Sequence, residues 1–276
     1  MRLVITALYA PADRPERFAK AYASGADEVI LDLEDAVAST AKERARSLLE
    51  QAIAIGDGLP TQVRVNAPGT PWHAEDLAAV AALPPQVGVR LPKCESAAAV
   101  EAMAKQVPGR ALHLLVESAA GVEQLSALAR VPGAAGVGLG EADLRSDLGL
   151  SGEVALDQIR TSLVVAARAA GLPAPLGAAY TDVGDAEGLL ASTRHLADLG
   201  FVGRTVIHPR QIATVRRAFT PSPDRVDRAR RALAALAGAT ETGSGVVLLE
   251  DGTFLDPAMV RLHQRTVQLA DQLAGR

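Results

Sequence analysis

The chain has 276 residues, of which 49% are hydrophobic and 22% are charged, and its net charge at pH 7 is −4. This is an ordinary globular composition, and the length suits one large domain or two small ones. The modest negative charge, the scattered basic residues and the 3% of aromatic residues argue against a protein that binds nucleic acid.

Short β-rich segments alternate with Ala-rich segments of helical character over residues 1–220. The predicted strands are residues 3–10, 27–33, 61–67, 86–93, 111–118, 134–141, 175–182 and 203–209. Such alternation predicts parallel pairing, and eight strand–helix units predict an α/β fold of the (β/α)8 TIM barrel type. An open doubly wound sheet is the alternative, but its first turn is normally glycine-rich, and here that turn reads YAPADRPERF.

A C-terminal extension follows the predicted barrel. Pro221 and Pro223 mark a turn, so we place the catalytic barrel in residues 1–220 and the extension in residues 221–276. A basic helix comes first, then two short apolar runs around Asp251-Gly252 that predict a β-hairpin, and then a last helix. This helix–hairpin–helix extension is not needed to close a barrel. It either packs on the barrel or, as we expect, contacts a neighbouring subunit.

Cysteine and histidine are too sparse for several kinds of site. Cys94 is the single cysteine, which excludes an intrachain disulfide framework and a Cys-rich metal site. The five histidines are far apart and form no zinc spacing. No apolar run has the length of a membrane span, and the N-terminal residues do not read as a signal peptide. We therefore expect a soluble, cytoplasmic protein with neither a membrane nor a nucleic acid as its partner.

Acidic residues stand where several predicted strands end, which is the end at which TIM barrels bind their substrates. They are Asp32, Glu34, Asp35, Glu117, Glu141, Asp143 and Asp182. Clustered carboxylates repel one another, and a bound cation removes that penalty. Oxygen ligands without clustered Cys or His favour Mg²⁺ or Mn²⁺, and Glu117 with Asp143 matches the one or two carboxylates that Mg²⁺ usually takes. The alternative for each acid is that it caps the following helix.

Three basic or titratable residues at strand ends have competing interpretations. Arg64 either grips a substrate carboxylate in a bidentate manner or forms a structural ion pair with one of the acids. Lys93 either forms a Schiff base or contacts solvent or a ligand phosphate. His208 is either an acid or base, or a hydrogen-bonding residue at the start of the last barrel helix.

Several stretches together resemble one family. PADRPERFAKAYASGADEVILDLEDAV, RVNAPGTPWHAEDL, LPKCES, LVESAAG, ADLRSDLG and GFVGRTVIHPRQI are similar to the citrate lyase beta-subunit-like branch of the HpcH/HpaI aldolase superfamily. The resemblance extends over nearly the whole chain and includes the tail motif TFLDPA. It implies a (β/α)8 barrel that assembles as a homotrimer or hexamer. It also implies Mg²⁺-dependent cleavage or formation of a carbon–carbon bond, in which a 3-hydroxyacyl thioester of coenzyme A or acyl carrier protein is exchanged for a keto acid and an acetyl-type thioester.

The resemblance also implies roles for individual residues. Glu117 and Asp143 match metal ligands, and Arg64 matches the arginine that binds the keto-acid carboxylate. Asp35 matches an acid on the same rim, and we hypothesise that it acts as a base through water. Arg14 lies in a loop near the thioester, and Glu117 also contacts the substrate. Asp256 matches a tail aspartate that enters a neighbouring subunit's site, where it exchanges a proton with the enolate carbon.

Three departures and three alternative functions stay open. The family usually reads Gly-Ala-Glu-Asp where this chain has residues 140–143 as GEAD, which leaves the role of Glu141 open. Arg204 stands where lysine is common, and LYAPADR lacks the glycine that usually precedes the aspartate. One alternative is a beta subunit that acts on an acyl-carrier-protein thioester only within a citrate lyase complex. Another is a Schiff-base aldolase that uses Lys93, and the third is a barrel kept as a binding module. The sequence does not choose among malyl, citramalyl and citryl thioesters.

Overall fold

The structure is a computed structural model that describes residues 3–241, 246–248, 254–256 and 259–274. The chain divides into two compact units, Met1–Arg217 and Ala218–Arg276, and each is described by itself. Within the described residues, none of the helices combines the length and the apolar character needed to cross a membrane.

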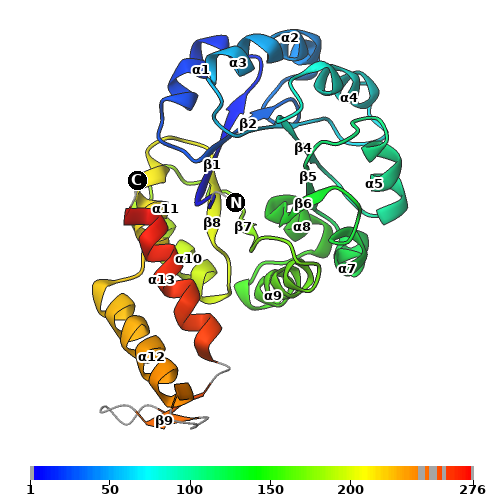
Figure 1. Cartoon of the computed structure of the whole chain (residues 1–276). Helices are drawn as coiled ribbons and strands as arrows, with labels where there is room; N and C mark the ends of the chain where they lie inside the picture. The colour runs from blue at the N-terminus through cyan, green and yellow to red at the C-terminus, as the bar shows by residue number, and fades with distance from the viewer. Residues whose placement is uncertain (1–2, 242–245, 249–253, 257–258, 275–276) are drawn as a thin grey trace. The chain divides into compact units, whose positions relative to one another are not determined.

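Eight strands of the first unit form one parallel sheet in the order β6-β5-β4-β3-β2-β1-β8-β7. Their bounds are β1 (Thr6–Pro11), β2 (Glu28–Asp32), β3 (Thr61–Arg64), β4 (Gly88–Leu91), β5 (Leu112–Val116), β6 (Ala134–Leu139), β7 (Leu176–Gly177) and β8 (Gly203–Val206). Figure 1 shows these strands as an inner ring that is nearly closed between β6 and β7. The predicted (β/α)8 barrel is therefore confirmed.

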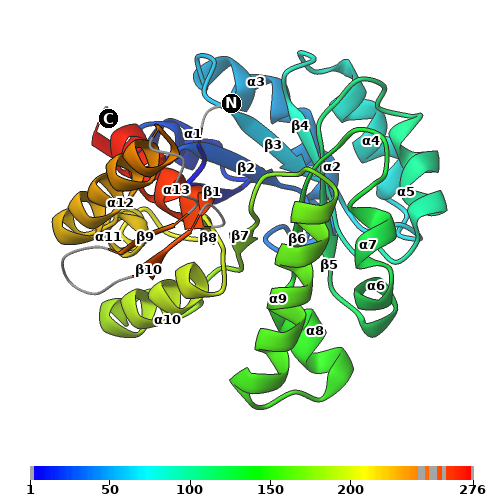
Figure 2. The ribbon, with the colours of Figure 1, turned by 60° about the horizontal axis from the view of Figure 1, so that its bottom comes forward.

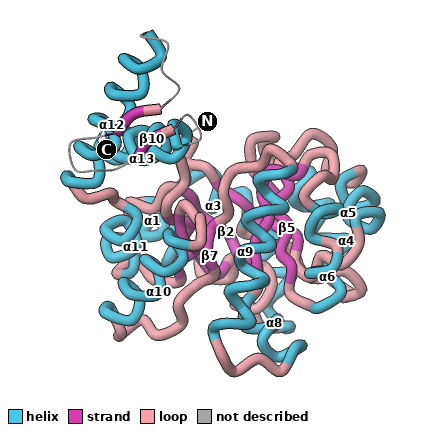
Figure 3. Tube along the Cα trace, turned by 90° about the horizontal axis from the view of Figure 1, so that it is seen from below, coloured by secondary structure: helices cyan, strands magenta, loops and turns pink. Residues whose placement is uncertain are grey.

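Helices surround the strands of this unit. They are α1 (Pro15–Tyr22), the 3-10 turn η1 (Ser39–Ala41), α2 (Lys42–Ser47), α3 (Leu49–Ile55), α4 (His73–Ala82), α5 (Ala97–Ala104), α6 (Ala119–Glu123), α7 (Leu125–Leu128), α8 (Glu141–Leu148), α9 (Glu153–Ala169), α10 (Ala186–Asp198) and α11 (Gln211–Phe219). In the view from below, α4, α5, α10 and α11 lie outside the strands (Figure 3). Side-chain oxygens of Ser96, Ser118 and Asp185 cap α5, α6 and α10 by accepting backbone N–H bonds.

The core lies between this ring of helices and the sheet. All five residues of β2 and all four of β4 are buried, which suits their apolar residues, as expected for parallel strands covered on both faces. The largest fully buried side chains include Phe18, Ile30, Leu31, Leu91 and Leu114. Burying one such side chain stabilises the fold by roughly 1.5–3 kcal/mol. This packing makes the strands a rigid frame for the residues at their ends.

The seventh predicted strand, residues 175–182, was predicted too long, since β7 covers only Leu176–Gly177. The carbonyls that follow β7 bond to side chains rather than to a neighbouring strand. Arg204 Nε donates to the Ala178 carbonyl at 2.8 Å, and Gln211 Nε2 donates to the Tyr180 carbonyl at 2.8 Å. Asp182 then accepts backbone N–H bonds from Gly184 and Asp185, which turns the chain toward α10.

The second unit has the predicted order of helix, hairpin and helix. It contains α12 (Pro223–Glu241), β9 (Val247–Leu248), β10 (Phe254–Leu255) and α13 (Val260–Ala274), and the two short strands pair antiparallel. Its own buried cluster consists of Ala232, Leu236 and Leu255, against which Val247, Met259 and Val260 pack. The predicted turn residues Asp251 and Gly252 lie outside the described residues. The expected contact with a neighbouring subunit stays a prediction.

Asp27, which directly precedes β2, holds the backbone at the start of β1. One oxygen of this buried carboxylate accepts N–H bonds from Ile5 and Thr6, each at 2.9 Å, and the other lies 2.6 Å from Arg216 Nη2 on α11. The carboxylate thus joins the segment that enters β1 to the last helix of the barrel. Two backbone donors and a guanidinium depend on it.

We expect Asp27→Ala to lower the free energy of unfolding by about 3–5 kcal/mol, because it leaves these donors without their acceptor. Urea denaturation of the full chain measures this change. Glu50→Ala, which removes an exposed carboxylate from α3, serves as the control and should shift the value by less than about 0.5 kcal/mol. Equal stability of the two variants would contradict the role assigned to Asp27.

Candidate active site

The register of two neighbouring strands places Asp32 beside Arg64. These residues end β2 and β3, and they are direct partners in the parallel ladder. Arg64 Nε donates to Asp32 Oδ1 at 2.7 Å and Nη2 donates to Oδ2 at 2.6 Å, so the pair is bidentate. Asp32 also accepts the backbone N–H groups of Glu34 and Ala36. The same carboxylate therefore fixes the arginine and the loop that follows β2.

The remaining nitrogen of Arg64, Nη1, faces the other two acids of this loop. It lies 3.0 Å from Asp35 Oδ2 and 3.1 Å from Glu34 Oε2. The guanidinium also lies over the Tyr9 ring, 5.0 Å from the ring centroid. Of the two interpretations of Arg64, the structural ion pair is therefore present. Asp32 holds Nε and Nη2, and Nη1 is paired instead with Asp35 and Glu34.

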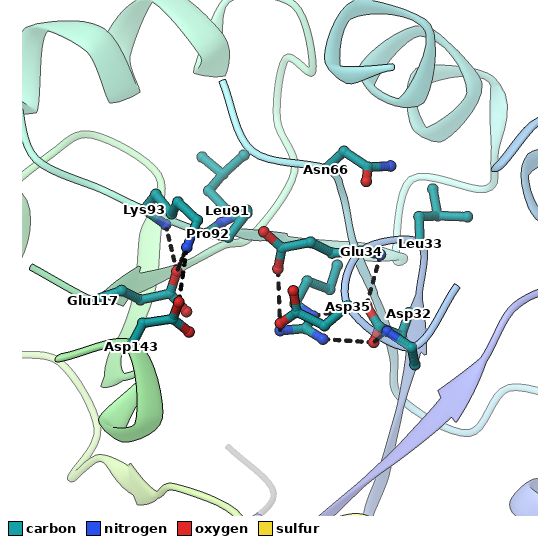
Figure 4. A network of polar contacts seen from close by, with 12 residues as sticks. Asp32, Leu33, Glu34, Asp35, Asn66, Leu91, Pro92, Lys93, Glu117 and Asp143 are labelled. Atoms are coloured by element: carbon teal, nitrogen blue, oxygen red, sulfur yellow. Dashed lines mark hydrogen bonds and ion pairs between the residues drawn. The ribbon is translucent and has the colours of Figure 1, made fainter. Parts of the chain in front are cut away.

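Glu34 is, like Asp32, a buried acid of this group. It is only 7% exposed, and burial raises the pKa of its carboxyl to about 8, against the opposing effect of the Arg64 guanidinium. The carboxylates of Asp35 and Glu117 add to the rise. In Figure 4 the Glu34 side chain points toward the side on which Glu117 and Asp143 lie.

Lys42 holds the loop that follows β2 through backbone carbonyls of that loop, and the sequence analysis did not predict this role. Its buried ammonium donates to the carbonyls of Leu33 and Glu34, both at 2.7 Å, and lies 5.3 Å from the centroid of the Trp72 ring. Lys42 belongs to the segment AKERARS, which looks like an ordinary exposed helix in the sequence. The only available signal was its place one short turn after the three acids.

A second group of charges forms across β4, β5 and β6. Glu117 directly follows β5, Asp143 lies in the first turn of α8 after β6, and Lys93 lies just beyond β4 (Figure 4). The Lys93 ammonium is 3.5 Å from Glu117 Oε2 and 3.2 Å from Asp143 Oδ1. The backbone N–H of Lys93 also donates to Glu117, from a left-handed conformation with φ of 51°. One cation thus joins the two predicted metal ligands.

Gly140 makes room for the Glu117 side chain. A Cβ atom at position 140 would lie 2.3 Å from Glu117 Oε1 and 2.6 Å from its Cγ. The Gly140 N–H donates to the carbonyl of Val116, so the backbone at this point is fixed by the pairing of β5 and β6. Only the absence of a side chain lets the carboxylate cross in front of β6.

The Glu117 and Asp143 pair fits a hard divalent cation. The donor set consists of carboxylate oxygens, and the Lys93 ammonium already shows that both carboxylates can reach a common positive charge. Burial raises the pKa of Glu117, Lys93 opposes this effect, and Asp143 adds to it. A cation between the two acids would remove this repulsion. Mg²⁺ needs no more than one or two protein carboxylates, because water and substrate supply the other ligands.

The other residues predicted for the site make different contacts or belong to the second unit. Glu141 turns to α9, where it forms a bidentate pair with Arg160 at 2.8 and 2.6 Å, and α8 and α9 lie side by side in Figure 2. His208 accepts the Arg210 N–H at 3.1 Å, so its structural interpretation is the observed one. Arg14 is exposed at the start of α1, 3.7 Å from Asp13. Asp256 belongs to the second unit, and its role stays a prediction.

The fold and these two charge groups define a (β/α)8-barrel protein that carries a pair of carboxylates and an arginine at the carboxyl ends of its strands. Comparison with known proteins agrees with this class. Residues 6–209 match the family model HpcH/HpaI aldolase/citrate lyase. The chain belongs to this family.

Individual relatives match over most of the chain. A (3S)-malyl-CoA thioesterase of Cereibacter sphaeroides is 34% identical over 97% of this chain and 95% of its own length. A citrate lyase subunit beta-like protein of Mycobacterium tuberculosis is 42% identical over 83% of each chain. The crystal structure of CitE from M. tuberculosis in complex with magnesium, acetoacetate and coenzyme A superposes with a TM-score of 0.83, at 36% identity and 98% coverage of both chains.

We expect Gly140→Ala to weaken Mg²⁺ binding by at least tenfold while the barrel stays folded. The new Cβ displaces the carboxylate of Glu117, which is the flexible end of a side chain and can move without disturbing the backbone. Isothermal titration with Mg²⁺ measures the affinity, and circular dichroism checks the fold. Gly152→Ala is the matched control, since a Cβ there meets nothing within 4 Å. Unchanged affinity in Gly140→Ala would show that Mg²⁺ binding does not depend on where Gly140 lets the Glu117 carboxylate lie.

Proposed function

We propose that the protein is a Mg²⁺-dependent carbon–carbon lyase that cleaves or forms a 3-hydroxyacyl thioester of the malyl, citramalyl or citryl type. The products of cleavage would be a keto acid and an acetyl-type thioester. The observation that carries the proposal is that the Glu117 and Asp143 carboxylates stand at the same strand ends as an arginine whose Nη1 is not held by Asp32. Relatives named for malyl-CoA and citrate lyase chemistry support it.

The chain's own residues then have defined tasks. Arg64 Nη1 would bind and orient the carboxylate of the keto-acid half, because Nε and Nη2 are held by Asp32. Glu117 and Asp143 would hold Mg²⁺, which when bound polarises the oxygens of the substrate as a Lewis acid. Asp35 would help to hold Nη1 in place, as its 3.0 Å contact allows. Arg14 and the tail residue Asp256 remain proposed for thioester binding and for proton transfer at the enolate carbon.

We extend the proposal to assembly and location. If Asp256 acts in a neighbouring subunit's site, the active form is an oligomer, and a homotrimer or hexamer is our expectation. A cytoplasmic location agrees with a substrate that is a thioester of coenzyme A or of an acyl carrier protein. A beta subunit that needs the other chains of a citrate lyase complex is the alternative within the same chemistry, since one relative is the citrate lyase subunit beta of Leuconostoc mesenteroides.

The Schiff-base alternative is disfavoured by the surroundings of Lys93. Burial acts to lower the pKa of this ammonium, but the Glu117 carboxylate and the hydrogen bond to Asp143 outweigh it, so the pKa is raised. A Schiff base requires a neutral amine as nucleophile, and activated lysines have a lowered pKa. Both carboxylates instead keep Lys93 protonated.

Thioester hydrolysis is a second candidate function, because a (3S)-malyl-CoA thioesterase is 34% identical over nearly the whole chain. The two reactions leave different products. A lyase acting on malyl-CoA releases glyoxylate and acetyl-CoA, whereas hydrolysis releases malate and free coenzyme A. Product analysis by mass spectrometry separates them without any assumption about residues.

We expect the purified chain to release a keto acid from at least one of the three thioesters, and EDTA to abolish the reaction. Glu117→Gln and Asp143→Asn should each lower kcat by roughly a thousandfold or more, because the cation loses a ligand. The same variants should lose Mg²⁺ binding in a calorimetric titration.

Glu123→Gln is the control for this experiment, since it removes an exposed carboxylate from the neighbouring helix α6. It should retain both Mg²⁺ affinity and turnover. Turnover that survives in Glu117→Gln and Asp143→Asn would refute the metal site. Release of a hydroxy acid and free coenzyme A in place of a keto acid would replace the lyase by the thioesterase.

A further inference from the structure

Within the described residues, Glu34 combines burial with a carboxyl oxygen, Oε2, that accepts no hydrogen bond and is held by an ion pair with Arg64 Nη1 at 3.1 Å. Both oxygens of Asp32 accept bonds from Arg64, and Asp35 is 67% exposed to solvent at its side chain. Glu117 accepts the Lys93 N–H and pairs with the Lys93 ammonium.

The position of Glu34 lies between the two charge groups. Its backbone is fixed from both sides, because its N–H donates to Asp32 and its carbonyl accepts the Lys42 ammonium. Its side chain points toward Glu117 and Asp143 in Figure 4. A keto acid whose carboxylate meets Arg64 Nη1 and whose oxygen meets a cation at Glu117 would therefore pass in front of the Glu34 carboxyl.

We propose that Glu34 is the catalytic residue that exchanges a proton with the hydroxyl of the 3-hydroxyacyl thioester. This inference rests on the proposed lyase function. It assigns to Glu34 the role of general base that the sequence analysis had given to Asp35. Asp35 is then a positioning residue for Arg64, because its solvated carboxylate reaches Nη1 from the outside.

The proton transfer balances in both directions. In cleavage, the Glu34 carboxylate accepts the hydroxyl proton and the O–H electron pair forms the carbonyl of the keto acid. The bond from that carbon to the α-carbon of the thioester breaks, and its electron pair passes to the enolate, which takes a proton from a second acid. In condensation, the Glu34 carboxyl returns its proton to the new alkoxide. The proton count balances, because Glu34 gains the hydroxyl proton and the second acid loses the proton that the enolate takes up.

The charged surroundings let Glu34 carry a proton near neutral pH. The groups that face it are Arg64, Lys42, Lys93, Asp32, Asp35 and Glu117. Burial, together with the carboxylates of Asp35, Glu117 and Asp32, outweighs the effect of Arg64 and raises the pKa of Glu34 to about 8. Since cleavage needs the carboxylate, its rate should be full above this pKa and fall as the pH drops through it. Condensation needs the protonated form and should fall as the pH rises.

Glu34→Gln tests the proposal. Glutamine keeps the size of the side chain, and the bonds to Asp32 and Lys42 use only the backbone of residue 34. We expect kcat to fall by about 10²–10⁴-fold, as for other general bases. Binding of oxaloacetate in the presence of Mg²⁺, measured by calorimetry, should change less than about threefold. The acidic limb of the cleavage pH profile should disappear.

Asp35→Asn is the matched comparison, because it removes the other acid that contacts Nη1. It should raise the KM or the oxaloacetate dissociation constant and keep the acidic limb. If Glu34→Gln raised KM but kept the kcat and the pH profile of the wild type, the proposal would be overturned. Glu34 would then be a positioning residue. A wild-type chain that binds Mg²⁺ but turns over none of the thioesters would instead refute the lyase function, and Glu34's assignment with it.

Discussion

The buried pair between Arg64 and Asp32 is the constraint on which the site depends. Breaking a buried ion pair by removing one partner typically costs about 3–5 kcal/mol. The register of β2 and β3 sets this pair, and the Tyr9 ring supports the guanidinium from β1. The arginine is therefore held in place. In the proposed reaction, a keto-acid carboxylate would approach Nη1, the nitrogen that Asp32 does not hold.

Acidic side chains are in excess over basic ones at this rim. Asp32, Glu34, Asp35, Glu117 and Asp143 stand against Arg64, Lys42 and Lys93. The acids outnumber the bases, and burial prevents water from screening all of them. The structure relieves this excess in two ways. Lys93 links Glu117 to Asp143, and the raised pKa of Glu34 favours its protonated form.

The sequence was sufficient for the barrel and for most of the rim. Asp32, Arg64 and Glu117 could be predicted because each ends or directly follows an apolar run that must be a buried strand. Glu141 could not be separated from Asp143 in this way, since both lie in the first turn of α8. Its pairing with Arg160 on α9 is a long-range contact that no local pattern reveals.

The roles of Lys42, Gly140 and Glu34 could not be predicted from the local sequence, because each depends on surroundings that exist only in the folded chain. Lys42 acts through carbonyls of a loop that only the folded chain brings to it. Gly140 matters because of an atom on a different strand, and nothing near it in the sequence requires glycine. Glu34 and Asp35 are neighbours with similar chemistry, and only the path of the loop buries one and exposes the other.

The shared nitrogen of Arg64 links substrate binding to the state of Glu34. Nη1 lies 3.1 Å from Glu34 and 3.0 Å from Asp35, so a keto-acid carboxylate held at Nη1 in the proposed reaction would lie beside both acids. Glu34 is buried, and the added negative charge would raise the pKa of its carboxyl further, so its carboxylate would be a stronger base toward the hydroxyl of the substrate. The geometry proposed to orient the substrate would thereby also activate the proton acceptor, and the Arg64–Asp32 pair underlies both effects.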